Sequence, residues 1–216
     1  MNRTRLGAIV LMSLLAGHAH GQAASHPDLN AQLLVAAREG QDTAVLALLH
    51  QGAAVDARNR VGKTPLFMAA EKGHDELAAA LLTAGANPNV ASVERVTALM
   101  AACYAGHTAV VRLLLDAGAD TAPLDRMSKA AAVYAAGEGR TEALQLLLDH
   151  GVPVNAVYAN RLTALMWAAG QGHADTVKLL MAHGADAALR DDRGLTAADM
   201  ARQGGHADVL VQLVSP

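Results

Sequence analysis

The fold of this chain is decided by residues 64–86, which read TPLFMAAEKGHDELAAALLTAGA. Thr64 is a good N-cap because its hydroxyl can accept a free backbone N–H, and Pro65 follows at the first helical position, where its missing N–H costs nothing. Gly73 suits the left-handed residue that ends this short helix. A second helix with apolar residues three and four apart then runs to Gly85. The stretch therefore predicts two short helices joined by a tight turn.

This pattern recurs every 33 residues along almost the whole chain. Such a period is typical of stacked repeats, in which each unit can bury its apolar face only against its neighbours. Two of the registers that agree are the glycines Gly40, Gly73, Gly106, Gly139, Gly172 and Gly205, and the leucines Leu48, Leu81, Leu114, Leu147, Leu180 and Leu213. We therefore predict an all-α solenoid of about six helix-turn-helix repeats with short β-hairpin or loop fingers.

The composition supports helices and excludes several kinds of site. Apolar residues make up 52% of the chain but aromatic residues only 2%, so Ala, Leu, Val and Met must form the core, which favours closely packed helices over a sheet. A formal net charge of −3 gives no support to nucleic-acid binding. Cys103 is the only cysteine, which excludes an intramolecular disulfide and a cysteine-based zinc site.

The repeats resemble the ankyrin repeat family. The Thr-Pro-Leu opening of that family is matched at Thr64 and, as Thr-Ala, at Thr97, Thr163 and Thr196, while its Gly-His step is matched at His74, His107, His173 and His206. The resemblance implies an ankyrin repeat domain over residues 24–216, with repeats near 28–58, 59–91, 92–124, 125–157, 158–190 and 191–216. It also implies that partners contact the fingers and the exposed side of the first helices, which form the concave face.

Two departures from the family pattern carry expectations of their own. The fourth repeat has Ala130 in place of the capping threonine and Arg140 in place of the histidine, so we expect it to be the least stable interior repeat. The finger glycine, present at Gly62 and Gly194, is replaced in the other fingers by Arg95, Ser128 and Arg161. A left-handed backbone would strain each of these by about 1–2 kcal/mol, so we expect a different turn there.

The first residues predict an exported protein. Arg3 and Arg5 precede an apolar run over 6–16 and a small, polar stretch, which is the order of a secretory signal peptide over residues 1–23, cleaved after Gly21 or Ala23. The alternative is an amphipathic helix that stays attached. The apolar run is too short to span a bilayer as a helix, so we expect no stable membrane insertion. A periplasmic or secreted location follows.

Other candidate sites have simpler explanations. The repeated histidines are spaced too far apart to share a metal ion and are expected to pack at the turns between repeats. Cys103 occupies a small, buried position of a first helix, where a thiol is inert. The sequence contains no hydrolase, phosphate-binding or metalloprotease motif, so we assign no catalytic residue, metal or cofactor.

A binding surface is predicted on the concave face. Basic residues recur near the finger tips, which favours an acidic partner, although ordinary solvated turn charges would give the same pattern. Apolar residues at turn positions, together with a tyrosine, would form the centre of an interface with arginines at its rim. The predicted partner-binding residues are Arg60, Val61, Lys63, Val96, Tyr104, Arg126, Met127, Asn160 and Leu162.

The function predicted from the sequence is a non-catalytic, monomeric protein-interaction module that acts as a scaffold, inhibitor or protective partner of another exported protein. The alternative is a binder of an anionic cell-envelope glycan or lipid head group through the basic finger residues. Salt distinguishes the two, because a purely electrostatic contact weakens more as the ionic strength rises.

Overall fold

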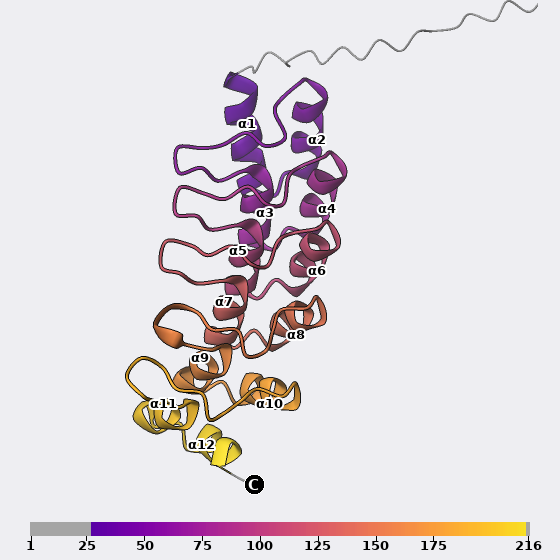
Figure 1. Cartoon of the computed structure of the whole chain (residues 1–216). Helices are drawn as coiled ribbons and strands as arrows, with labels where there is room; N and C mark the ends of the chain where they lie inside the picture. Colours follow the sequence, from indigo (N-terminus) through magenta and orange to yellow (C-terminus); the bar gives the residue numbers. More distant parts are fainter. Residues whose placement is uncertain (1–26, 215–216) are drawn as a thin grey trace, which may run out of the picture.

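The computed structural model describes residues 27–214, which form a stack of helix pairs (Figure 1). The first helices are α1 (Pro27–Arg38), α3 (Pro65–Lys72), α5 (Ala98–Ala105), α7 (Ala131–Gly137), α9 (Ala164–Gln171) and α11 (Ala197–Gly204). The second helices are α2 (Asp42–His50), α4 (Asp75–Thr83), α6 (Thr108–Asp116), α8 (Thr141–Asp149), α10 (Ala174–Ala182) and α12 (Ala207–Val214). A 3-10 turn spans Ala159–Arg161.

The predicted all-α solenoid is confirmed over this range. First helices pack against first helices and second helices against second helices, and the fingers project beside the first helices (Figure 1). Between residues 27 and 214 no strand is present, so the fingers are loops. None of the helices in this range is long and apolar enough to cross a membrane. The predicted signal peptide lies outside the described residues.

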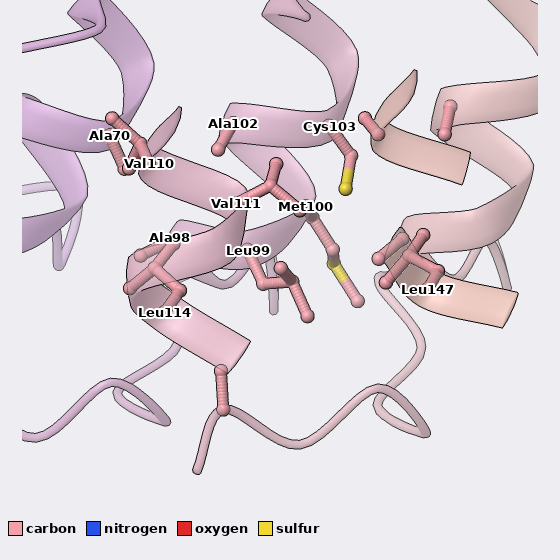
Figure 2. Close-up of a cluster of buried hydrophobic side chains, with 14 of the residues drawn as sticks. Ala70, Ala98, Leu99, Met100, Ala102, Cys103, Val110, Val111, Leu114 and Leu147 are labelled. Carbon is pink, nitrogen blue, oxygen red and sulfur yellow. The ribbon is translucent and has the colours of Figure 1, made fainter. Parts of the chain in front are cut away.

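Small and aliphatic side chains fill the core, as the composition requires. Figure 2 shows Leu99 and Cys103 of α5 with Leu114 of α6, all fully buried between the neighbouring repeats. Alanines line much of the first helices, so adjacent helices can approach closely. Burial raises the pKa of the Cys103 thiol, which agrees with the predicted inert role.

The helix ends follow the sequence signals. The hydroxyls of Thr64, Thr97, Thr163 and Thr196 each accept a backbone N–H from the residue three positions later. Gly73, with φ of 74°, closes α3 in the left-handed region. At the start of α7, Ala130 provides no side-chain cap, and the Val133 N–H donates instead to the Ala130 carbonyl at 3.1 Å.

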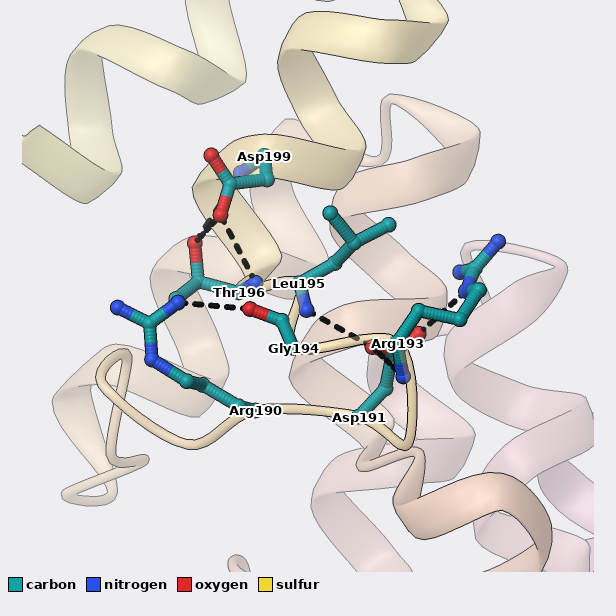
Figure 3. Close-up of polar contacts among 7 residues, drawn as sticks. All are labelled: Arg190, Asp191, Arg193, Gly194, Leu195, Thr196 and Asp199. Carbon is teal, nitrogen blue, oxygen red and sulfur yellow. Dashed lines mark hydrogen bonds and ion pairs between the residues drawn. The ribbon is translucent and has the colours of Figure 1, made fainter.

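Five fingers precede the first helices from α3 onward. We name each by its first residue: the Asn59 finger (59–63), the Ser92 finger (92–96), the Asp125 finger (125–129), the Tyr158 finger (158–162) and the Asp191 finger (191–195). In each, the N–H of the first residue donates to the carbonyl of the fifth at 2.9–3.1 Å. In the Asp191 finger, Asp191 Oδ1 also accepts the N–H groups of Arg193 and Leu195 (Figure 3). Asn59 and Asp125 make the same pair of bonds, whereas no hydrogen bond of this kind comes from the Tyr158 side chain.

Two carboxylates hold the last finger and the helix that follows it (Figure 3). Burial raises the pKa of Asp191, but hydrogen bonds from Leu195 and Arg193 outweigh it and hold that pKa below its usual range. Asp199 accepts the backbone N–H and the hydroxyl of Thr196, which lower its pKa. Acidification through these low pKa values therefore removes stabilisation that is present at neutral pH.

The predicted change of turn at the replaced finger glycines is wrong. Arg95, Ser128 and Arg161 have φ of 61°, 58° and 59°, close to the left-handed values of Gly62 and Gly194. Each still donates its N–H to the carbonyl of the first finger residue, at 2.9–3.1 Å. These bonds, repeated from finger to finger, keep the turn in spite of the strain of a side chain at positive φ.

The histidines lie at the turns between repeats, as predicted. His173 Nε2 is 2.9 Å from the Gly137 carbonyl, and His206 Nε2 is 3.1 Å from that of Gly170. In the fourth repeat Arg140 takes over this role, because its Nε donates to the Tyr104 carbonyl at 3.1 Å. The missing histidine therefore removes no link between the third and fourth repeats.

One junction in the stack lacks two of its links. Between other fingers a tip bond joins the backbones, from Val93 N to Val61 O, from Arg126 N to Glu94 O and from Asp192 N to Asn160 O. The equivalent Ala159 N and Met127 O make no such bond in the described chain. A second series, in which Asp56, Asn89 and Asn155 side chains accept N–H groups of the next repeat, is also interrupted there. At this junction Ala122 stands where Asp56, Asn89 and Asn155 supply the accepting side chain. Pro153 stands at the donor position and has no N–H.

A threonine at position 130 should restore the missing helix cap. Ala130 is buried to the same degree as Thr64 and Thr97, which cap their helices from equivalent positions. We expect Ala130→Thr to raise the free energy of unfolding by about 1 kcal/mol and Thr97→Ala to lower it by a similar amount. Urea unfolding measures both. A destabilised Ala130→Thr variant would contradict the expectation.

Glycine should relieve the strain in the fingers. We expect Arg95→Gly to stabilise the protein by about 1 kcal/mol, because glycine adopts positive φ without cost. Gly194→Ala is the reverse control, since an added Cβ meets nothing within 4 Å and only φ strain is introduced. Gly62→Ala should cost more than Gly194→Ala, because its Cβ would lie 2.9 Å from the Val93 backbone nitrogen. Equal effects of the two alanines in thermal unfolding would argue against this explanation.

Candidate functional site

Several hollows lie on the concave face, between the fingers and the first helices, and two of them together contain every aromatic side chain. The Tyr104 hollow, of about 450 Å³, is lined by residues that include Val61, Lys63, Phe67, Val96, Tyr104 and Tyr134. The Trp167 hollow, of about 220 Å³, is lined by residues that include Met127, Lys129, Tyr158, Asn160, Leu162 and Trp167. The Asn59 and Ser92 fingers border the first hollow, and the Asp125 and Tyr158 fingers border the second.

Every aromatic residue of the chain lines one of these hollows. The chain has one phenylalanine, three tyrosines and one tryptophan. Phe67, Tyr104 and Tyr134 line the Tyr104 hollow, and Tyr158 and Trp167 line the Trp167 hollow. Tyr104 and Tyr134 meet edge to face, with ring centroids 5.8 Å apart. The aromatic side chains are therefore concentrated on the face that the fingers overhang.

A hydrogen bond fixes Tyr134 at the rim of the Tyr104 hollow. Its hydroxyl donates to Asp125 Oδ2 at 2.5 Å, and the other oxygen of this buried carboxylate accepts the N–H groups of Met127 and Lys129. Burial, followed by the contact with Asp125, raises the pKa of Tyr134, so the hydroxyl stays protonated at neutral pH. The Asp125 finger and α7 are thus held together by this carboxylate.

The two lysines of the hollows have different surroundings. Lys63 Nζ lies 4.8 Å from the centre of the Phe67 ring and forms an ion pair with Glu71 at 2.8 Å. Lys129 Nζ lies 4.7 Å from the centre of a Trp167 ring and 5.5 Å from that of Tyr134. Over residues 27–214, no carboxylate forms an ion pair with Lys129. Lys129 therefore presents an uncompensated positive charge between two aromatic rings.

The structure divides the predicted partner-binding residues between these hollows. Val61, Lys63, Val96 and Tyr104 come together in the first, and Met127, Asn160 and Leu162 in the second. Arg126 lines neither hollow, and its guanidinium Nη1 lies 3.7 Å from Glu94 Oε1. Arg60 borders a separate depression beside α1, with Arg38 and Arg58.

Sequence reasoning missed four aromatic residues of the site, namely Phe67, Tyr134, Tyr158 and Trp167. Tyr158 opens a finger, and the other three occupy first helices, where periodicity assigns apolar residues to the core. Their rarity was the available signal, because a core of alanine and leucine needs no aromatic side chain and none of the aromatics falls on a second helix. In the described part of the chain, no group of three His, Cys, Asp or Glu side chains could hold a metal ion.

The chain is similar to known proteins over most of its length. Residues 33–125 and 131–216 match the family model described as ankyrin repeats. The crystal structure of EF0377, an ankyrin repeat protein, is 30% identical, with a TM-score of 0.78 over 86% of this chain and 96% of that one. No match was found among curated proteins.

Removing the Tyr134 hydroxyl should loosen the site from within. We expect Tyr134→Phe to lower the free energy of unfolding by about 1–3 kcal/mol, because it leaves an oxygen of the buried Asp125 without its partner. Tyr104→Phe is the matched control, since the half-exposed Tyr104 belongs to the same ring pair and its hydroxyl makes no hydrogen bond in the described chain. Equal stabilities of the two variants in urea would contradict a structural role for the Tyr134 bond.

Proposed function

The chain belongs to the ankyrin repeat family, and we propose on that basis that it is a protein-interaction module that binds another exported protein through its concave face. Ankyrin repeats indicate protein–protein interaction in general. The observation that supports this particular face is the placement of all five aromatic side chains in its two hollows. Aromatic residues are enriched at the energetic centres of protein interfaces. Phe67 is itself buried, and Tyr134, Tyr158 and Trp167 pack against the core while also lining the hollows.

The exposed residues around the hollows fit an interface with an apolar centre. Val61, Tyr104 and Met127 are 53%, 52% and 69% exposed, although they are large and apolar or aromatic. They lie on neighbouring fingers and helices of one face rather than singly over the surface. An interface of this kind excludes water from its centre and leaves charged groups at its rim.

The proposed location is the periplasm or the extracellular space. It rests on the basic, apolar and polar order of residues 1–23, which is that of a secretory signal. The single cysteine fits a bacterial periplasm better than a disulfide-rich extracellular space. A scaffold, an inhibitor and a protective partner of an exported enzyme would all use the same surface.

Binding to an anionic glycan or lipid head group is the second candidate. Arg60, Arg95 and Arg161 are exposed and form no ion pair in the described chain, which favours it. Against it, Lys63, Arg126 and Arg193 are each paired with a carboxylate of the protein itself. The pairing removes part of the positive charge from this face, and the apolar hollows between the remaining basic residues suit a protein surface better.

Affinity capture from a periplasmic extract tests the concave face. We expect the protein to retain a partner at moderate salt, and the joint variant Val61→Glu, Tyr104→Glu and Met127→Glu to lose it. The three side chains are exposed, so their replacement should leave the fold intact.

A matched control carries the same change of charge on the second helices. Leu46→Glu, Ala109→Glu and Ala182→Glu alter exposed positions of α2, α6 and α10 and should leave capture unchanged. A partner that is retained undiminished by the concave variant would refute the assignment of this face. Binding to anionic vesicles or glycans that disappears as salt is raised would favour the second candidate.

A further inference from the structure

The Trp167 hollow opens where the finger series is interrupted. The Asp125 and Tyr158 fingers border this hollow. They lack the tip bond that joins each of the other pairs of consecutive fingers. Ala159 N–H and Met127 C=O, which would form that bond, make no hydrogen bond within the described chain and both residues line the hollow. An unpaired backbone donor and an unpaired backbone acceptor therefore belong to residues that border a hollow with aromatic walls.

The turn of the Tyr158 finger, which borders this hollow, has one more left-handed residue than the turns of the other fingers. Asn160 and Arg161 both have positive φ, at 58° and 59°, whereas the Ser92 and Asp125 fingers have one such residue each. Tyr158 stands where Asn59, Asp125 and Asp191 hold their fingers through side-chain bonds, and its ring lines the hollow instead. The finger thus exchanges an internal hydrogen-bonding group for an aromatic surface.

The charge in the hollow has no internal counterpart. Lys63 and Lys129 occupy equivalent finger positions 66 residues apart, yet only Lys63 has an acidic neighbour, Glu71, and the residue equivalent to Glu71 beside Lys129 is Gly137. The one carboxylate close by, Asp125, is buried and already accepts three hydrogen bonds. Glu94 is engaged by Arg126. A carboxylate for Lys129 would have to come from another molecule.

We propose that the Trp167 hollow receives an extended acidic segment of the partner protein, which sets an Asp or Glu carboxylate against Lys129 and a neighbouring large apolar side chain against Trp167. The hollow has a volume of about 220 Å³, which gives room for one such side chain. The unpaired Ala159 N–H and Met127 C=O supply hydrogen bonds to the backbone of the segment. This proposal rests on the function proposed above and specifies the chemistry of the partner.

Selection of short random peptides displayed on phage, with the purified protein as bait, tests the proposal. We expect the enriched peptides to carry an Asp or Glu next to a large apolar residue. Synthetic copies of these peptides should bind the Lys129→Met variant about tenfold or more weakly than the unchanged protein. Changing the Asp or Glu of the peptide to Asn or Gln should weaken its binding to the unchanged protein by a similar factor. The two changes together should cost little more than either alone, because they remove one contact.

Lys63→Met is the matched control. It removes an equivalent lysine whose charge is already balanced by Glu71, so peptide affinity should change little. Thermal unfolding of both lysine variants establishes that they fold alike. Because Lys129 also contacts Trp167 and Tyr134 through its ammonium group, Lys129→Arg is added and should retain most of the affinity.

The outcomes separate the two proposals. No enrichment at all would overturn the acidic-segment proposal alone. Enriched peptides without acidic residues, or peptides whose affinity Lys129→Met leaves unchanged, would also overturn it. If these peptides nevertheless lose affinity on the joint change of Val61, Tyr104 and Met127 to Glu, the concave face remains the binding surface. If they are insensitive to that variant as well, the proposed function fails with it.

Discussion

The structure depends on one constraint, which is that no helix pair in this chain can bury its apolar face alone. Each pair therefore packs its first and second helices against those of its neighbours, and the close spacing of the pairs limits the interior to small and aliphatic side chains. Alanine at the contact positions lets the first helices approach, and leucine fills the layer between first and second helices. The five aromatic side chains line the hollows beneath the fingers, and Tyr134, Tyr158 and Trp167 pack there against the edge of this core. Stacking of the repeats thus positions both the core and the aromatic residues of the concave face.

Stacking also explains why local strain is tolerated. A finger that left the common conformation would lose its own closing bonds and, at most junctions, the tip bond to the next finger. Arg95 and Ser128 therefore keep the left-handed backbone of Gly62, at a strain of about 1–2 kcal/mol each that the surrounding bonds offset. Arg140 shows the same adaptation in a side chain, because it reaches the carbonyl that a histidine reaches in other repeats. The position of a residue within the repeat thus decides its backbone conformation more strongly than its residue type does.

This explains which features could be predicted from the sequence. The period, the threonine caps and the glycine ends are local signals repeated in register, so helices and solenoid followed from them. The turn at Arg95 did not, because the bonds that keep it come partly from the neighbouring finger. Phe67 and Trp167 have the periodicity of core residues, and only the overhang of the fingers places them beside a hollow. The junction at Ala122 and Pro153 requires pairing two residues 31 positions apart, which no local pattern shows.

The interrupted junction and the Trp167 hollow occur at the same place in the stack, between the Asp125 and Tyr158 fingers. The missing tip bond leaves the Ala159 N–H and the Met127 carbonyl free at the border of the hollow that Trp167 and Lys129 line. The Tyr104 hollow lies beside fingers that a tip bond does join, so the missing bond supplies free backbone groups rather than the space itself. The absence of this bond costs only the modest net stabilisation of an exposed backbone bond, about 1 kcal/mol, because water can satisfy both groups. The hollow combines an aromatic wall, a free ammonium group and two backbone groups ready to pair. It is present without a partner, so a bound segment would find it already formed.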